Sequence, residues 1–185
     1  QSEALKLFDN IFNLRQFLSG RTFWVGNTQV SSNYPMANFN CAFEVIDNFG
    51  AFKDLFYLLM IGSGVGVRIL KSDVNKLPAL RTDFDVVHRF YSPLKEEERE
   101  ENTGLKFSNG NTAEIIIGDS KEGWTDALDF FIKLLHVNGY RKIKTIILNY
   151  DNVRGKGEKL KTFGGTSSGH ESLKNMFNKI VTVLR

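Results

Sequence analysis

Cys41 is the only cysteine in the chain and the side chain best suited to redox or nucleophilic chemistry. It opens the apolar run CAFEVI and is followed six residues later by Asp47. A single cysteine is either a small buried hydrophobic residue or a reactive thiol. The nearest charged residues, Glu44 and Asp47, are both acidic and would not stabilise a thiolate. The local sequence alone therefore favours a buried and unreactive Cys41.

A glycine-bearing turn, GSGVGV, begins at Gly62. It differs from the dinucleotide-binding pattern G-x-G-x-x-G because Val67 replaces the third glycine. It also leads from a predicted helix into a predicted strand, which is the reverse of the dinucleotide-binding order. The dinucleotide interpretation therefore fails. Two interpretations remain: a backbone that a phosphate or sugar can approach closely, or a plain helix end before a strand.

A second glycine-rich segment, RGKGEKLKTFGGTSSGHE, places Arg154, Lys156, Lys159 and Lys161 in one loop. Hydroxyl-bearing residues follow, at the start of a predicted helix. Cations, hydroxyls and a helix N-terminus together can bind phosphate. The segment lacks the G-K-[ST] ending of a P-loop. A solvated basic turn with an ordinary Ser or Thr cap is the other interpretation.

Length and composition predict a globular chain of about one domain, with 185 residues of which 42% are hydrophobic. A net charge of +3 is too small to indicate a nucleic-acid surface. The three histidines, His88, His136 and His170, share no ligand spacing with Cys41, so we expect no metal site. The single cysteine indicates a reducing compartment, and the chain has neither a signal peptide nor an apolar run of the ~18 residues that span a membrane. We therefore expect a cytoplasmic protein that binds neither nucleic acid nor membrane.

Hydrophobic periodicity predicts alternating helices and strands in the first part of the chain. Asp47 or Asn48 is expected to cap the second helix. The expected elements are a helix over 3–19 ended by Gly20, a strand over 21–26, a loop over 31–40, a strand over 41–46, a helix over 49–61 and a strand over 63–70.

The pattern changes after residue 72, where an acidic run at 95–102 is expected to be a solvated loop without a function. Asp119 or Ser120 is expected to cap the helix that follows. The expected elements are strands over 84–90, 113–118 and 143–150, and helices over 121–138 and 172–185. This alternation predicts an α/β fold with partly parallel strands. The apolar strands AEIIIG and IKTIIL predict burial on both faces.

Five segments are far more specific together than any one of them is alone. They are FNLRQFLSGRTFWVGNT, NFNCAF, LLMIGSGVGVRI, DSKEGWTDAL and VRGKGEKLKTFGGTSSGHESL, in this order. The combination covers nearly the whole chain and resembles the large catalytic chain of ribonucleotide reductases. It is most similar to the monomeric, adenosylcobalamin-dependent class that reduces ribonucleoside triphosphates.

The resemblance implies thiyl-radical chemistry that forms deoxyribonucleotides, with adenosylcobalamin as cofactor and a thioredoxin-like dithiol as reductant. It also implies a ten-stranded α/β barrel with a finger loop at its centre. Residues 1–70 would form the first part of this barrel. Residues 71–150 would be an inserted small α/β lobe that imitates the partner subunit of dimeric members. Residues 151–185 would hold an effector loop and the next barrel helix.

By the same resemblance, Cys41 is the first of two cysteines that reduce the substrate. Its partner would come from another strand, because a disulfide requires Cα atoms about 5.5 Å apart. An external dithiol would reduce that disulfide. The residues implied to border the substrate are Asn40, Gly62, Ser63 and Gly64.

The resemblance also implies a site for a deoxynucleoside triphosphate effector. Asp47 would lie near its ribose, and Arg154 and Lys161 near its phosphates. The same effector loop would include Gly164, Gly165, Thr166 and Ser167. The helix over 121–136 would close the site with the face that carries Trp124.

Several parts that such an enzyme requires are not found in this sequence. They are the radical cysteine, the second redox cysteine, the catalytic Glu and Asn, the cobalamin site and the C-terminal shuttle cysteines. We therefore expect the chain to be a segment of a longer polypeptide, shortened by truncation or by a gene split, and inactive alone. Two other interpretations stay open: a free-standing nucleotide sensor that uses only the loop 154–169, and a subunit-interface scaffold with a degenerate site.

Overall fold

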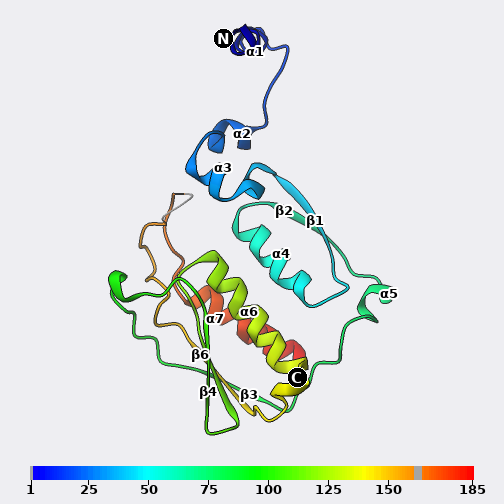
Figure 1. The fold of residues 1–185 in the computed structure, drawn as a ribbon, viewed down its shortest axis with the longest axis vertical. Helices are drawn as coiled ribbons and strands as arrows, with labels where there is room; N and C mark the ends of the chain where they lie inside the picture. The colour runs from blue at the N-terminus through cyan, green and yellow to red at the C-terminus, as the bar shows by residue number, and fades with distance from the viewer. Residues whose placement is uncertain (1, 161–163) are drawn as a thin grey trace.

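The structure is a computed structural model that describes residues 2–160 and 164–185. Its N-terminal part is extended, and helix α1 (Ser2–Phe12) lies away from the rest of the molecule (Figure 1). Three short helices follow: α2 (Gly20–Val25), α3 (Gln29–Asn33) and the 3-10 helix η1 (Pro35–Asn38). None of the residues of α1 is buried.

A two-stranded parallel sheet comes next, formed by β1 (Cys41–Val45) and β2 (Gly64–Arg68). Helix α4 (Gly50–Met60) connects the two strands. The Asn48 side chain accepts a hydrogen bond from the backbone N–H of Ala51 at 3.2 Å, as expected for a residue that caps this helix. The short helix α5 (Lys71–Val74) then leads into the second half of the chain.

The second half is built on a four-stranded sheet with the order β3-β6-β5-β4. Strand β6 pairs in parallel with both β3 and β5, and β4 pairs antiparallel with β5. The strands are β3 (Asp85–His88), β4 (Gly104–Ser108), β5 (Thr112–Ile116) and β6 (Thr145–Asn149). The helices are η2 (Glu96–Glu98), α6 (Lys121–His136), η3 (Asn138–Tyr140) and α7 (Glu171–Leu184).

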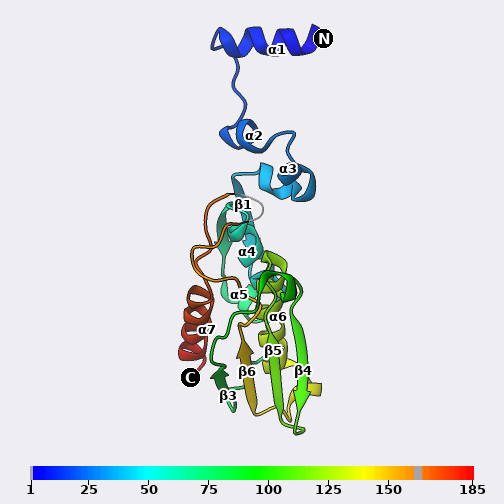
Figure 2. The same ribbon diagram turned by 90° about the vertical axis from the view of Figure 1, so that its left-hand side faces the viewer.

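The main hydrophobic core lies between this sheet and helices α6 and α7, which run along one of its faces (Figure 2). Ala113 and Ile115 of β5 are fully buried, whereas their neighbours on the strand are only half-buried. The expected burial of both faces is therefore wrong for the described residues, because helices cover only one face. The fold is mixed α/β as predicted. Within the described residues the sheets do not close into a barrel.

The predicted long N-terminal helix is wrong, because α1 ends at Phe12. Leu14 adopts a positive φ of 57°. The N–H groups of Leu14 and Arg15 donate to the carbonyls of Ile11 and Asn10, which closes the helix as a Schellman motif does. Local backbone hydrogen bonding thus ends a helix whose hydrophobic periodicity continues.

The predicted strand over 21–26 is also wrong, because helix α2 occupies this segment. The Ser19 hydroxyl accepts a hydrogen bond from the N–H of Thr22 at 3.1 Å and caps the helix. Gly20 therefore begins a helix instead of ending one. The predicted loop over 31–40 contains the end of α3 and all of η1.

No described helix is long and apolar enough to cross a membrane. The described part of the chain also contains no group of three or more His, Cys, Asp or Glu side chains that could hold a metal ion.

Candidate functional site

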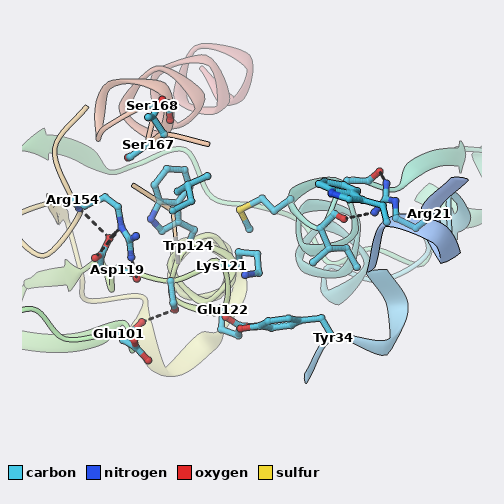
Figure 3. A pocket seen from close by; sticks show the side chains of 17 residues that line it. Arg21, Tyr34, Glu101, Asp119, Lys121, Glu122, Trp124, Arg154, Ser167 and Ser168 are labelled. Carbon is cyan, nitrogen blue, oxygen red and sulfur yellow. Dashed lines mark hydrogen bonds and ion pairs between the residues drawn. The ribbon is translucent and has the colours of Figure 1, made fainter. Parts of the chain in front are cut away.

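A cavity of about 490 Å³ lies where the C-terminal end of α4 faces the N-terminal end of α6 (Figure 3). This volume is in the range of pockets that bind small molecules and nucleotides. Figure 3 shows Trp124 near the middle of the cavity, with Asp119 and Arg154 on one side and Arg21 on the other. The lining residues used below are Arg21, Tyr34, Gly62, Lys121, Trp124, Arg154, Thr166, Ser167 and Ser168.

Arg21 forms one wall by binding the carbonyl groups at the end of α4. Its guanidinium donates to the carbonyl oxygens of Ile61 at 3.1 Å and Gly62 at 2.7 Å. A positive charge at a helix C-terminus is favourable, because the last carbonyl groups have no partner within the helix. Gly62 has a φ of 84°, and a Cβ there would meet the Arg21 guanidinium at 3.2 Å. Arg21 thus occupies part of the space beside the Gly62 backbone in which a ligand was expected to bind.

Arg154 forms the opposite wall and is held by Asp119. Its Nε lies 3.0 Å and 3.2 Å from the two carboxylate oxygens of Asp119. Its backbone N–H donates to the same carboxylate at 3.0 Å, and its Nη1 donates to the carbonyl of Lys159. The side chains of Arg154 and Asp119 are 12% and 8% exposed, so the ion pair is largely removed from water. Arg154 therefore has a structural partner before any phosphate is present.

The glycine-rich loop folds back on itself, as its sequence predicts. Lys159 and Thr166 form an antiparallel bridge, and the N–H of Leu160 donates to the carbonyl of Gly165 at 3.0 Å. Gly164 and Gly165 have φ values of 71° and 86°, which non-glycine residues rarely adopt. The fold of the loop places Thr166, Ser167 and Ser168 at the cavity. Lys161 lies outside the described residues.

Lys121, from the first turn of α6, is a cavity residue that the sequence did not identify as functional. The Lys121 ammonium lies 4.2 Å from the centre of the Tyr34 ring. Burial lowers the pKa of Lys121, although the nearby Glu122 acts in the opposite direction. Burial also raises the pKa of Tyr34. Trp124, on the helix face that the resemblance places at the effector site, is half-buried and lines the cavity.

Cys41 is exposed at the first position of β1, directly opposite Gly64 of β2. Its interpretation as a buried hydrophobic residue is therefore wrong. The N–H of Gly64 donates to the carbonyl of Asn40 at 2.8 Å, which brings the predicted substrate residues together. Ser63 is buried and its hydroxyl donates to the carbonyl of Phe39 at 2.9 Å. Of these predicted residues only Gly62 also lines the cavity.

Asp47 lies beyond the other end of β1 and does not line the cavity. Its carboxylate accepts hydrogen bonds from the side chains of Asn48 at 3.0 Å and Lys76 at 3.1 Å. The hydrogen bond from Asn48, followed by that from Lys76, lowers the pKa of Asp47. The structure thus brings Arg154, Thr166 and Ser167 together at one cavity, whereas Asp47 lies elsewhere.

Comparison with known proteins relates this chain and its fold to B12-dependent ribonucleotide reductases. Residues 97–184 match the family described as "B12-dependent ribonucleotide reductase, insertion domain". A crystal structure of a B-12 dependent (class II) ribonucleotide reductase is similar over 99% of this chain, with a TM-score of 0.80 and 23% identity, and 29% of that structure is covered. The fold is therefore that of part of a class II ribonucleotide reductase.

Curated relatives are adenosylcobalamin-dependent ribonucleoside-triphosphate reductases. The enzyme of Lacticaseibacillus paracasei is 28% identical over 100% of this chain, and that of Lactobacillus helveticus is 29% identical over 99%. The chain spans 28% and 29% of the length of these two relatives. These matches confirm the resemblance drawn from the sequence: the chain is related, along its whole length, to a part of such a reductase.

Proposed function

We propose that this chain is a segment of a class II ribonucleotide reductase that converts ribonucleoside triphosphates into deoxyribonucleotides by thiyl-radical chemistry. The observation that carries the proposal is the similarity of the whole chain to one part of these enzymes, together with the exposed thiol of Cys41. A free-standing sensor would need only the loop and the cavity. It would not require an accessible cysteine on β1 beside the glycine-bearing turn that begins at Gly62.

In this proposal Cys41 is one of two cysteines that supply electrons to the substrate. The two thiols together give two electrons and two protons, and they become a disulfide. The C2′–O bond of the ribose breaks, its hydroxyl leaves as water, and hydrogen takes its place. The second cysteine belongs to another part of the full-length protein. A thioredoxin-like dithiol then reduces the disulfide by thiol–disulfide exchange.

The exposure of Cys41 agrees with this role, because disulfide exchange requires access to the sulfur. Asn40 and Gly64, joined by a backbone hydrogen bond, border the same end of β1. Substrate bound there would face backbone on one side and the thiol on the other.

Adenosylcobalamin does not fit the described residues. A corrin ring with its nucleotide tail is much larger than a nucleoside triphosphate, and the cavity holds about 490 Å³. The ion-paired and largely buried Arg154 and Asp119 form one wall of this cavity. We therefore assign the cofactor to other parts of the full-length protein and derive no step through it.

We also propose that the loop from Arg154 to Gly169 binds a deoxynucleoside triphosphate effector. The hydroxyl-bearing residues of the loop and the cation Lys121 line one cavity, which supports a polyphosphate ligand. Lys161, in the same segment of the sequence, is proposed to supply a second cation to the effector phosphates. The proposed ribose contact of Asp47 requires the effector site to extend beyond the cavity. We propose that the protein is cytoplasmic, because its single cysteine indicates a reducing compartment.

The experiment that tests the catalytic proposal is the substitution Cys41→Ser in the full-length protein. We expect normal folding, because the side chain is exposed, but loss of multiple-turnover reduction with a dithiol reductant. Phe43→Leu, at another exposed position of β1, is the matched control and should retain turnover. Sustained turnover of the Cys41→Ser protein would show that the thiol is not part of the redox pair.

The effector proposal is tested by titration of the full-length protein with deoxynucleoside triphosphates. We expect Lys161→Ala to weaken binding by about tenfold, which is the loss of one charge-assisted contact. Lys142→Ala makes the same chemical change on the exposed turn before β6, at the opposite end of that strand from the loop, and should leave the affinity unchanged. Equal affinities for wild type and Lys161→Ala would contradict the assignment of Lys161.

A further inference from the structure

Arg99 is a nearly buried cation within the acidic run at 95–102, for which the sequence predicts a solvated loop. Its side chain is only 9% exposed. Its Nε donates to the carbonyl of Leu94 at 2.9 Å, which fixes the guanidinium beside its own segment. An arginine is rarely buried without a charged partner, because removing its charge from water is unfavourable.

The partner of Arg99 is Glu158, at the root of the glycine-rich loop. The two guanidinium nitrogens Nη1 and Nη2 lie 2.7 Å and 3.1 Å from the two oxygens of the Glu158 carboxylate. This two-point geometry fixes the orientation of both groups as well as their distance. Glu158 also accepts a hydrogen bond from the N–H of Gly155 at 2.6 Å. The Glu158 carboxylate thus connects the acidic run to the start of the loop.

A second ion pair lies beside the first. The Nη1 atom of Arg99 is 3.9 Å from the carboxylate of Asp119, the partner of Arg154. Two arginines and two carboxylates therefore form one network with balanced charges. They come from three separate segments: the run before β4, the start of α6, and the loop after β6.

The backbone of Glu158 transmits this constraint to the cavity. Its carbonyl accepts a hydrogen bond from the N–H of Ser167 at 2.7 Å, and the N–H of Gly157 donates to the carbonyl of Ser167 at 2.9 Å. Ser167 is buried and lines the cavity. Arg99 is thus linked to Ser167 through Glu158 and lies beside Asp119, both cavity residues, although it does not line the cavity itself.

We propose that Arg99 is a positioning residue: by holding Glu158, it fixes the root of the loop and thereby the hydroxyl-bearing segment Thr166–Ser168 at the cavity. The effect on loop conformation depends only on the contacts described above. The effect on nucleotide affinity rests on the proposed effector function.

The test uses the full-length protein and two measurements on each variant. The first is the rate of cleavage after Lys156 and Lys159 by a lysine-specific protease. Substitution of Arg99 leaves the sequence of these two cleavage sites unchanged. The second is the affinity for a deoxynucleoside triphosphate. For Arg99→Ala we expect cleavage at least about fivefold faster and binding about tenfold weaker, since the loop spends more time open. Arg99→Lys should give an intermediate result, because an ammonium cannot make the two-point contact.

Arg89→Ala is the matched control. Arg89 pairs with Glu114 at 3.0 Å and is 53% exposed, so its loss should change neither measurement. Glu158→Gln removes the same ion pair from the other side. Because the Glu158 side chain is 41% exposed, we expect this variant to stay folded. The double variant Arg99→Ala/Glu158→Gln should be no worse than either single variant, because the two residues act as a unit.

The outcomes separate the two proposals. Unchanged cleavage in both Arg99→Ala and Glu158→Gln would overturn the positioning role. Additive losses in the double variant would also overturn it. Faster cleavage in a protein whose wild type binds no deoxynucleotide would support the positioning role and reject the effector site.

Discussion

Glu158 lies at the centre of the network that anchors the loop, and its protonation state decides whether the network is intact. The hydrogen bonds from Arg99 and then from the N–H of Gly155 lower its pKa below the ordinary value of 4.5. A carboxylate with a lowered pKa in the folded protein stabilises the fold above its unfolded pKa, and this contribution is lost as the pH falls through the folded value.

We therefore expect the loop to be protected at pH 5 and above and to open as the pH falls below about 4.5. The measurement is hydrogen exchange of the backbone amides of residues 155–160, corrected for the intrinsic effect of pH on exchange. Glu158→Gln should remove this pH dependence and leave the loop open throughout. Protection that is constant from pH 6 to pH 3 in the wild type would contradict the role of the carboxylate.

At the same scale, the sequence predicted some site residues and missed others for identifiable reasons. Thr166, Ser167 and Arg154 stand in one glycine-rich segment, so a loop that folds back on itself necessarily brings them together. Arg21 and Arg99 were missed because each meets a partner far away in sequence. A search for lone cations next to predicted helices and within acidic runs could have suggested them, although not their partners.

Ser120 determines where helix α6 begins, and this fixes Lys121 and Trp124 at the cavity. Its hydroxyl accepts the N–H of Gly123 at 2.8 Å and donates to the carbonyl of Glu101 at 2.7 Å. It is therefore both a helix cap and a link to the acidic run.

We expect Ser120→Ala to lower the free energy of unfolding by about 1 kcal/mol, the usual effect of removing an N-cap. Chemical denaturation of the 185-residue chain measures this difference. Ser108→Ala, at the exposed end of β4, is the control and should change stability by less than about 0.5 kcal/mol. Equal stabilities of Ser120→Ala and wild type would show that other contacts fix the start of α6.

Elements with strong apolar patterns were predicted well, and those whose ends depend on local hydrogen bonds were not. Helices α4 and α6 and strands β1, β2, β3 and β6 lie within the predicted segments, and α7 and β5 each begin one residue before theirs. Near the N-terminus, the Ser19 cap and the positive φ of Leu14 determine the structure. Neither effect changes the spacing of apolar residues, so periodicity alone could not detect them.

At the scale of the whole molecule, the N-terminal segment adds little to the stability of the rest. Helix α1 has no buried residue, and Leu5, Phe8 and Phe12 are each more than 60% exposed, at 67%, 65% and 74%. The main core is formed by residues from Phe84 onward, with α4 packed against it.

We expect deletion of residues 1–17, which spares the Ser19 cap of α2, to leave the thermal unfolding midpoint of the 185-residue chain unchanged within about 2 °C, because almost no apolar surface would be newly exposed. Thermal unfolding followed by circular dichroism tests this expectation. A large fall in the midpoint would mean that α1 packs against the rest of the chain in solution.

The position of β6 at the centre of its sheet determines the order in which that sheet can be completed during synthesis. Strand β3 has no described partner other than β6, and it leaves the ribosome long before Thr145–Asn149. The β4–β5 hairpin can pair locally as soon as it emerges, and α6 can cover it. Until β6 arrives, β3 and β5 each present an unpaired edge that another nascent chain could join. The strand that is translated last is therefore the one that joins the two halves of the sheet.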